Sequence, residues 1–493
     1  MNWHRVSLSV VVAVVVVGMA GVMGAQAWAD EPRLAGQVSQ HGITWTFADE
    51  HEVGQFVNGD WWVVGPVTVV EVDPAPGPAP EGQETQLTQD QWGNTGLQDD
   101  NRWRNGSMVV YRAENRQGYD SRGRNFNEDA VTRFPLELDP NRSLISTISH
   151  VELPNRKMHW ELMWGSERNT HRVLRTAAVL TVVDEAPPAD AFRPPYVGFD
   201  KPIFRAGDLQ WDRLYELEAP DDVPAWSTIE RYMERPWLDH MNGSWLARTI
   251  APTENQPGYG REVGRIVSIA SLMVHLDVPR EQKETLLIRL VQYGIDLWGI
   301  AEAGGHWNEG GGHTSGRKWP ILFAGLMLDD DRFFDLPATA VFQEDTQTYY
   351  GQGWHGQTAL WQMVTHHGPR EPYEHKHPDD WERWDRTSES YRLCCTGRAW
   401  VGMALAARHM QAKRLWDHDA FFDYVDRFMA DPDPYAEQRG GRERPSQEAS
   451  TFDPFVDAMW RSHREAAPAE PYGDVHRMWD AQRRRWVQVT RPQ

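Results

Sequence analysis

The chain contains few cysteines, a deficit of basic residues and a single long hydrophobic run. Two cysteines in 493 residues exclude a disulfide-stapled scaffold and a cysteine-rich zinc module. Lys and Arg together number 50 against 71 Asp and Glu, which gives a formal net charge of −21. Nucleic acids and anionic membranes bind to basic surfaces, so this acidic chain is a poor candidate for either partner.

The long hydrophobic run lies at the N-terminus. Arg5 precedes an uncharged stretch at residues 6–25, and Ala27-Trp28-Ala29 follows it. A basic start, an apolar centre and an Ala-x-Ala site are typical of a secretory signal, here cleaved after Ala29. A retained membrane anchor is the alternative, because the run is almost long enough to span a bilayer. We expect an exported protein, periplasmic or extracellular, with no membrane contact after cleavage and no cofactor.

The hydrophobic pattern changes near residue 200. Before it, apolar and polar residues alternate in short runs, as at residues 43–47, which is typical of half-buried strands. After it, apolar residues recur at helical spacing, as at residues 263–274 and 400–410. The pattern therefore predicts a mixed α+β chain with several domains.

We divide the chain as follows: a signal peptide at residues 1–29, an antiparallel β-sandwich-like domain at residues 30–200, an all-α domain at residues 201–430, and a charged excursion with a C-terminal helical segment at residues 431–493. No repeat of fixed period is present, so a regular solenoid is not supported. Helical hairpins that close into an α/α toroid are compatible with the pattern.

The densest group of reactive side chains lies in a glycine-rich loop at residues 304–318. Its glycines allow a ligand to approach the backbone closely. The polar and aromatic side chains among them are His306, Trp307, Asn308, His313, Arg317 and Lys318. In so acidic a chain, this local excess of positive charge favours an anionic substrate. A second loop, at residues 255–262, presents Asn255, Tyr259 and Arg261 before a predicted helix.

Two other interpretations of the first loop compete. Its spacing is close to that of a phosphate-binding P-loop, but Arg317 and Lys318 occupy the positions of the motif's Lys and Ser/Thr, and the loop follows a helix. His306, Glu309 and His313 are residue types that bind zinc, although the chain has no His-Glu-x-x-His signature. We favour a proton-transfer site without a metal.

Weaker signals follow. Tyr350 belongs to a third glycine-containing loop and is a reserve proton donor. The histidine-rich residues 366–377 are expected to form a solvated surface loop. We expect Cys394 and Cys395 to be two small buried thiols, because the Cα atoms of neighbouring residues lie closer together than a disulfide prefers.

These features together resemble the polysaccharide lyases of the α/α-toroid type. The glycine-rich run to Lys318, the following Trp319-Pro-Ile-Leu-Phe-Ala-Gly325 and the upstream Tyr293-Gly-Ile-Asp-Leu-Trp-Gly299 are similar to sequences of uronan- and alginate-degrading proteins, with polysaccharide lyase family 38 the nearest. The resemblance covers residues 200–430. Toroid lyases often carry an Asn-Asn-His or Asn-His pair for the substrate carboxylate, whereas Asn308 and Asn255 are the nearest substitutes here.

The resemblance implies β-elimination of a uronic-acid-containing polysaccharide. That chemistry needs a base for the C5 proton, an acid for the departing oxygen and cations at the carboxylate. We assign the base and acid to His313 and Tyr259, and the carboxylate to His306, Asn308 and Arg317. The remaining substrate-binding candidates are Asn255 on the loop rim, Arg261 and Lys318 for neighbouring uronates, Trp307 for ring stacking and Tyr350.

Two other functions remain open at this stage. A glycoside hydrolase needs two facing carboxylates, and Glu262 and Glu309 from the two loops supply a pair. A non-catalytic carbohydrate-binding protein would account for the 25 tryptophans through recognition and packing.

Overall fold

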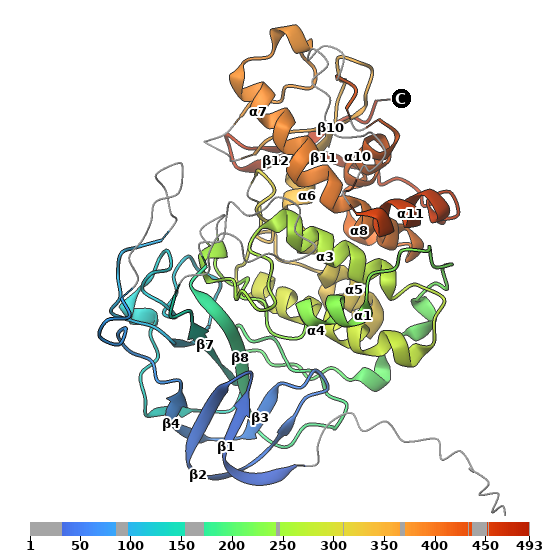
Figure 1. The fold of residues 1–493 in the computed structure, drawn as a ribbon. Coiled ribbons are helices and arrows are strands. Elements are labelled where there is room, and N and C mark those ends of the chain that lie inside the picture. The colour runs from blue at the N-terminus through green and yellow to red at the C-terminus, as the bar shows by residue number, and fades with distance from the viewer. Residues whose placement is uncertain are drawn as a thin grey trace, which may run out of the picture.

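The computed structural model describes residues 32–84, 97–152, 172–242, 247–308, 310–364, 370–431, 433–435, 451 and 453–492. Strands occupy the N-terminal region and helices predominate after it, so the predicted mixed α+β class is confirmed (Figure 1). The predicted signal peptide lies outside the described residues.

The N-terminal region contains one curled sheet of eight strands. They are β1 (Arg33–Gln40), β2 (Ile43–Gln55), β3 (Trp61–Val64), β4 (Val67–Asp73), β5 (Ser107–Val109), β6 (Leu136–Leu138), β7 (Arg142–Ser149) and β8 (Leu174–Val183). The order is β5-β7-β8-β3-β2-β4-β6, and β1 also pairs with β2. The β3–β8 pair is parallel, whereas β8 pairs with β7 in antiparallel fashion.

Alternation of side chains along the strands explains how the sheet joins the rest of the molecule. In β2, Ile43, Trp45 and Phe47 are buried, and the two threonines between them are half-buried. In β8, Ala177 and Val179 pack with the helical core, whereas Ala178 and Leu180 pack inside the curled sheet. Because successive side chains point to opposite faces, one central strand contributes to both cores.

The helical region lies above the sheet in the view of Figure 1. Its helices are α1 (Trp226–Tyr232), α3 (Gly260–Met273), α4 (Arg280–Glu302), α5 (Lys318–Leu328), α6 (Gln343–Gln347), α7 (Arg383–Tyr391), α8 (Gly397–His409), α9 (Lys413–Trp416), α10 (Asp419–Ala430) and α11 (Pro454–His463). The helical spacing at residues 263–274 and 400–410 correctly predicted α3 and α8. These two helices pack closely, and the Ser268 hydroxyl donates to the Ala399 carbonyl at 2.9 Å.

The C-terminal part differs from the predicted helical segment. After α11, strands β11 (His476–Asp480) and β12 (Arg485–Val489) form an antiparallel hairpin. A second short pair, β9 (Thr348–Tyr350) and β10 (Ala359–Trp361), lies within the helical region. Among the described helices, none combines the length and apolar character needed to cross a membrane.

The prediction of two separate thiols was wrong, because Cys394 and Cys395 form a disulfide. Both belong to a π-helical turn, Arg392–Thr396, which connects α7 to α8. A π-turn is wider than an α-helical turn, so successive side chains diverge by a smaller angle. The short Cα spacing on which the prediction rested, 3.7 Å here, does not prevent the bond.

Candidate functional site

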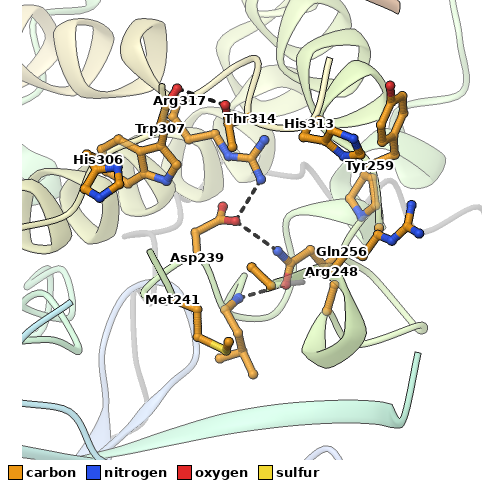
Figure 2. A pocket seen from close by; sticks show the side chains of 16 residues that line it. Asp239, Met241, Arg248, Gln256, Tyr259, His306, Trp307, His313, Thr314 and Arg317 are labelled. Atoms are coloured by element: carbon orange, nitrogen blue, oxygen red, sulfur yellow. Dashed lines mark hydrogen bonds and ion pairs between the residues drawn. The ribbon is translucent and has the colours of Figure 1, made fainter. Parts of the chain in front are cut away.

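A hollow of about 460 Å³ opens where three chain segments meet. Residues 238–241 lie on one side, residues 247–260 lead into α3 on another, and the glycine-rich residues 306–317 complete the wall. Five residues predicted to act on the substrate line this hollow together: Tyr259, His306, Trp307, His313 and Arg317 (Figure 2). The two loops singled out in the sequence therefore form one site.

Close backbone packing brings the two loops together. Gly260 is the first residue of α3, and a Cβ atom placed on it would lie 2.3 Å from the carbonyl oxygen of His313. Only glycine fits such an approach. As a result the rings of Tyr259 and His313 meet edge to face, with centroids 4.9 Å apart.

Tyr259 is held as a neutral phenol. Its side chain is buried and its hydroxyl donates a hydrogen bond to the carbonyl of Gly311. Burial raises the pKa of Tyr259 above its ordinary value, although the nearby Arg261 and Arg248 guanidinium groups act in the opposite direction. A phenol that stays protonated suits proton donation better than proton abstraction.

Two imidazoles lie at the hollow, and both are half-buried. The Nδ1 atom of His306 lies 3.2 Å from Oδ1 of Asn308. Because an amide oxygen only accepts, this contact places the proton of neutral His306 on Nδ1. The backbone N–H of His306 donates to Oδ1 of Asn242 at 3.1 Å, which fixes the start of the loop.

Arg317 lines the hollow, but its charge is already matched. Its Nη2 atom lies 2.8 Å from Oδ1 of Asp239, and both side chains are buried. Burial works against the charged form, yet Asp239 raises the pKa of Arg317. Asp239 also accepts from the Gln256 amide at 3.3 Å (Figure 2) and from the Tyr293 hydroxyl at 2.9 Å. The arrangement makes Arg317 a positioning residue rather than the carboxylate ligand that the sequence suggested.

Sequence reasoning missed Arg248 and Asp239, which both line the hollow. Arg248 is half-buried in a short helical turn, Arg248–Ile250, and Figure 2 shows it on the same side of the hollow as Tyr259. Neither residue lies in a glycine-rich loop or a recognisable motif. Their proximity to the site arises only from the tertiary fold.

Three predicted substrate-binding residues face the protein interior instead. Lys318 is buried, with its Nζ atom 2.5 Å from Oδ2 of Asp345. Asn255 is fully buried, and its Nδ2 atom donates to the Arg235 carbonyl at 2.9 Å. The Tyr350 hydroxyl donates to Oδ2 of Asp423 at 2.7 Å, which gives it a structural partner in another part of the helical region.

The structure also changes the roles expected of Arg261, Trp307 and Asn308. Arg261 pairs with the adjacent Glu262 at 2.5 Å and is absent from the lining of the hollow. Trp307 reaches the hollow, but it is only 4% exposed and its ring stacks on Phe342. The ring's contact with Phe342 argues against the stacking on a sugar ring that the sequence suggested, whereas Asn308 remains close to the hollow through its contact with His306.

The alternative metal and carboxylate sites gain no support from the part of the chain that the structure describes. In that part, no three His, Cys, Asp or Glu side chains are grouped for a metal ion. Glu309, His366 and His367 lie outside it. Glu262 is 2% exposed and paired with Arg261 and Arg265, so it does not face the hollow.

Comparison with known proteins gives no information about this site, so its function is inferred from its geometry. No protein-family profile matches the chain, and neither curated proteins nor solved structures gave a match.

Proposed function

We propose that the protein is an exported polysaccharide lyase that cleaves a uronic-acid-containing polymer by β-elimination, with an α/α-toroid type of helical domain. One observation carries this proposal: His306, His313 and Tyr259 lie at one hollow with Arg248 in its wall. These groups supply a base, an acid and positive charge, which are the three requirements of the reaction.

In this reaction the base removes the proton from C5, the electrons form the C4–C5 double bond, and the bond from C4 to the bridging oxygen breaks. We assign His313 as the base, since a neutral imidazole accepts a proton and the His313 ring lies at the hollow beside Tyr259. Tyr259 then donates a proton to the departing oxygen. This assignment follows from the protonated state of the buried phenol.

The C5 proton becomes acidic only when the adjacent carboxylate is stabilised as an enolate-like group. Arg248 and His306 supply this stabilisation, and Asn308 orients His306. Arg317 and Asp239 hold the wall of the hollow through their ion pair. The substrate is therefore expected to carry a negative charge, despite the acidity of the protein as a whole.

Hydrolysis is less well supported. A glycosidase uses two carboxylates at the scissile bond. Among the described residues that line the hollow, Asp239 is the sole carboxylate, and it is paired with Arg317.

The test is the ultraviolet absorbance of residues 30–493 incubated with alginate, glucuronan, pectate and glycosaminoglycans. We expect absorbance from a conjugated double bond to rise with one of these polymers. The variant His313→Ala should lose the signal, whereas His355→Ala, which changes an exposed histidine outside the hollow, should retain it. New reducing ends without absorbance would indicate hydrolysis, and saturable binding without any product would indicate a binding protein.

A further inference from the structure

The Cys394–Cys395 disulfide lies directly behind the candidate site. Cys395 is buried, and Cys394 is partly exposed. The π-helical turn that contains them packs against the glycine-rich loop at Gly312, which has a positive φ of 78°. A Cβ atom on Gly312 would lie 2.3 Å from the carbonyl oxygen of Cys395 and 2.9 Å from its Cβ. No space separates the disulfide-bonded turn from this loop.

The same loop is confined on its other side by α3. His313 follows Gly312, and its carbonyl lies against Gly260 at the start of that helix. The loop is thus held between α3 and the π-helical turn, and the His313 ring extends from the held segment into the hollow. A displacement of the turn toward the loop would have to displace His313 as well, because packed interiors do not absorb such movements locally.

A second connection leads from the turn to Tyr259. The Nη1 atom of Arg261 donates to the Cys394 carbonyl at 3.3 Å, and its guanidinium lies over the Tyr259 ring, 5.6 Å from the centroid. Tyr259 in turn donates to the carbonyl of Gly311 in the glycine-rich loop. Both proton-transfer groups therefore depend on the backbone of the cysteine pair.

We propose that the Cys394–Cys395 disulfide is a redox-sensitive clamp that holds His313 and Tyr259 in position for the proposed reaction, and that its reduction lowers turnover. This inference rests on the proposed function and concerns the regulation of the same site. It predicts that the protein is fully active in an oxidising compartment, the location expected of an exported chain, and less active while it is reduced.

The reaction that opens the clamp is exchange with a dithiol. One thiolate of the dithiol attacks the partly exposed Cys394 sulfur, and Cys395 leaves as a thiolate. The second thiol of the reagent then attacks the mixed disulfide and releases Cys394. One cysteine disulfide is lost and one reagent disulfide is formed, and the two thiol protons of the reagent end on the two cysteines.

The first test combines thiol counting with activity. The chain contains two cysteines, so free thiols should rise from none to two per molecule on treatment with dithiothreitol. Lyase activity should fall by roughly tenfold to a hundredfold, the cost of a small misplacement of reacting groups. The double variant Cys394→Ser/Cys395→Ser should have the low activity of the reduced protein and should not respond to the reagent.

A second readout does not depend on catalysis. Hydrogen exchange of the amides at residues 311–316 should become faster after reduction, while the amides of β8 remain unchanged. If no polymer is turned over but reduction speeds hydrogen exchange at residues 311–316, the redox-sensitive clamp is supported and the proposed lyase function is refuted. If two thiols appear with neither activity nor loop exchange altered, or if two thiols are already present before reduction, the clamp is refuted.

Discussion

Two neighbouring hollows in the described part of the molecule differ in how their charged groups are arranged. The candidate site is the first; the second, of about 340 Å³, lies between the sheet region and α1 and α4. Tyr293 lines the second hollow and donates to Asp239, which lines the first. In the second, Arg193 bonds to Asp60 at 2.5 Å and to Asp296 at 2.6 Å, and all three side chains are buried.

The comparison of the two hollows separates charged groups that stabilise the fold from groups that can react with a substrate. Arg193 connects the sheet region to α4 through two carboxylates, so its charge is satisfied within the fold. At the first hollow, two imidazoles and a phenol are present, and these groups exchange protons in enzymes. A polar lining alone does not identify a reactive site; the types of group and their partners do.

The largest effect should follow from breaking the buried ion pairs of the second hollow. Arg193→Met leaves Asp60 and Asp296 buried without their cation, and we expect the free energy of unfolding to fall by about 3–5 kcal/mol. Urea denaturation measures this loss. Arg102→Met, which breaks exposed pairs with Asp100 and Glu128, should cost less than about 1 kcal/mol. Equal losses of unfolding free energy in the two variants would show that the buried ion pairs stabilise the fold no more than the exposed ones do.

In the first hollow, substitution should affect rate far more than stability. His313→Ala is expected to lower turnover by about 10²–10⁴-fold, the usual contribution of a general base. Its loss of stability should be about 1 kcal/mol, mainly from the edge-to-face contact with Tyr259. Steady-state kinetics and urea denaturation, measured on the same preparation, separate the two. If His313→Ala lost much of its stability and retained its turnover, His313 would be a structural residue and not the base.

Acid should destabilise the protein through His240, a buried histidine that follows Asp239 in the chain. Burial lowers the pKa of His240 to about 4, below the ordinary value near 6.5 in the unfolded chain. The unfolded state therefore binds the proton first, so stability is full above pH 6.5 and falls as the pH drops toward 4. The slope is up to about 1.4 kcal/mol per pH unit. His240→Phe should reduce the slope between pH 6.5 and 4 in urea titrations; an unchanged slope would contradict this explanation.

The smallest effect concerns Trp307. Because its ring stacks on Phe342, Trp307→Phe should cost about 1 kcal/mol of stability and leave the KM for polymer nearly unchanged. A several-fold rise in KM at unchanged stability would restore the sugar-stacking role that the sequence suggested. Calorimetry and kinetics on the purified variant provide both values.

Sequence periodicity predicted α3 and α8, and glycine content identified two of the segments that form the hollow. Their meeting at Gly260 was not visible in the sequence, because that contact is tertiary. Lys318 was grouped with Arg317 because the two are adjacent. At the start of a helix, however, successive side chains diverge by roughly 100°, so Arg317 faces the hollow and Lys318 faces the core. No local pattern in the sequence indicated that Arg248 belongs to the site.

Product analysis in water enriched in oxygen-18, with the polymer that the absorbance panel identifies, distinguishes elimination from hydrolysis. Elimination forms products without adding water, so we expect unsaturated ends and no oxygen-18 beyond the slow exchange of free reducing ends. Hydrolysis adds one solvent oxygen at the cleaved bond. Products that contain oxygen-18 and lack the double bond would contradict the assignment of His313 and Tyr259 as the base and acid of an elimination.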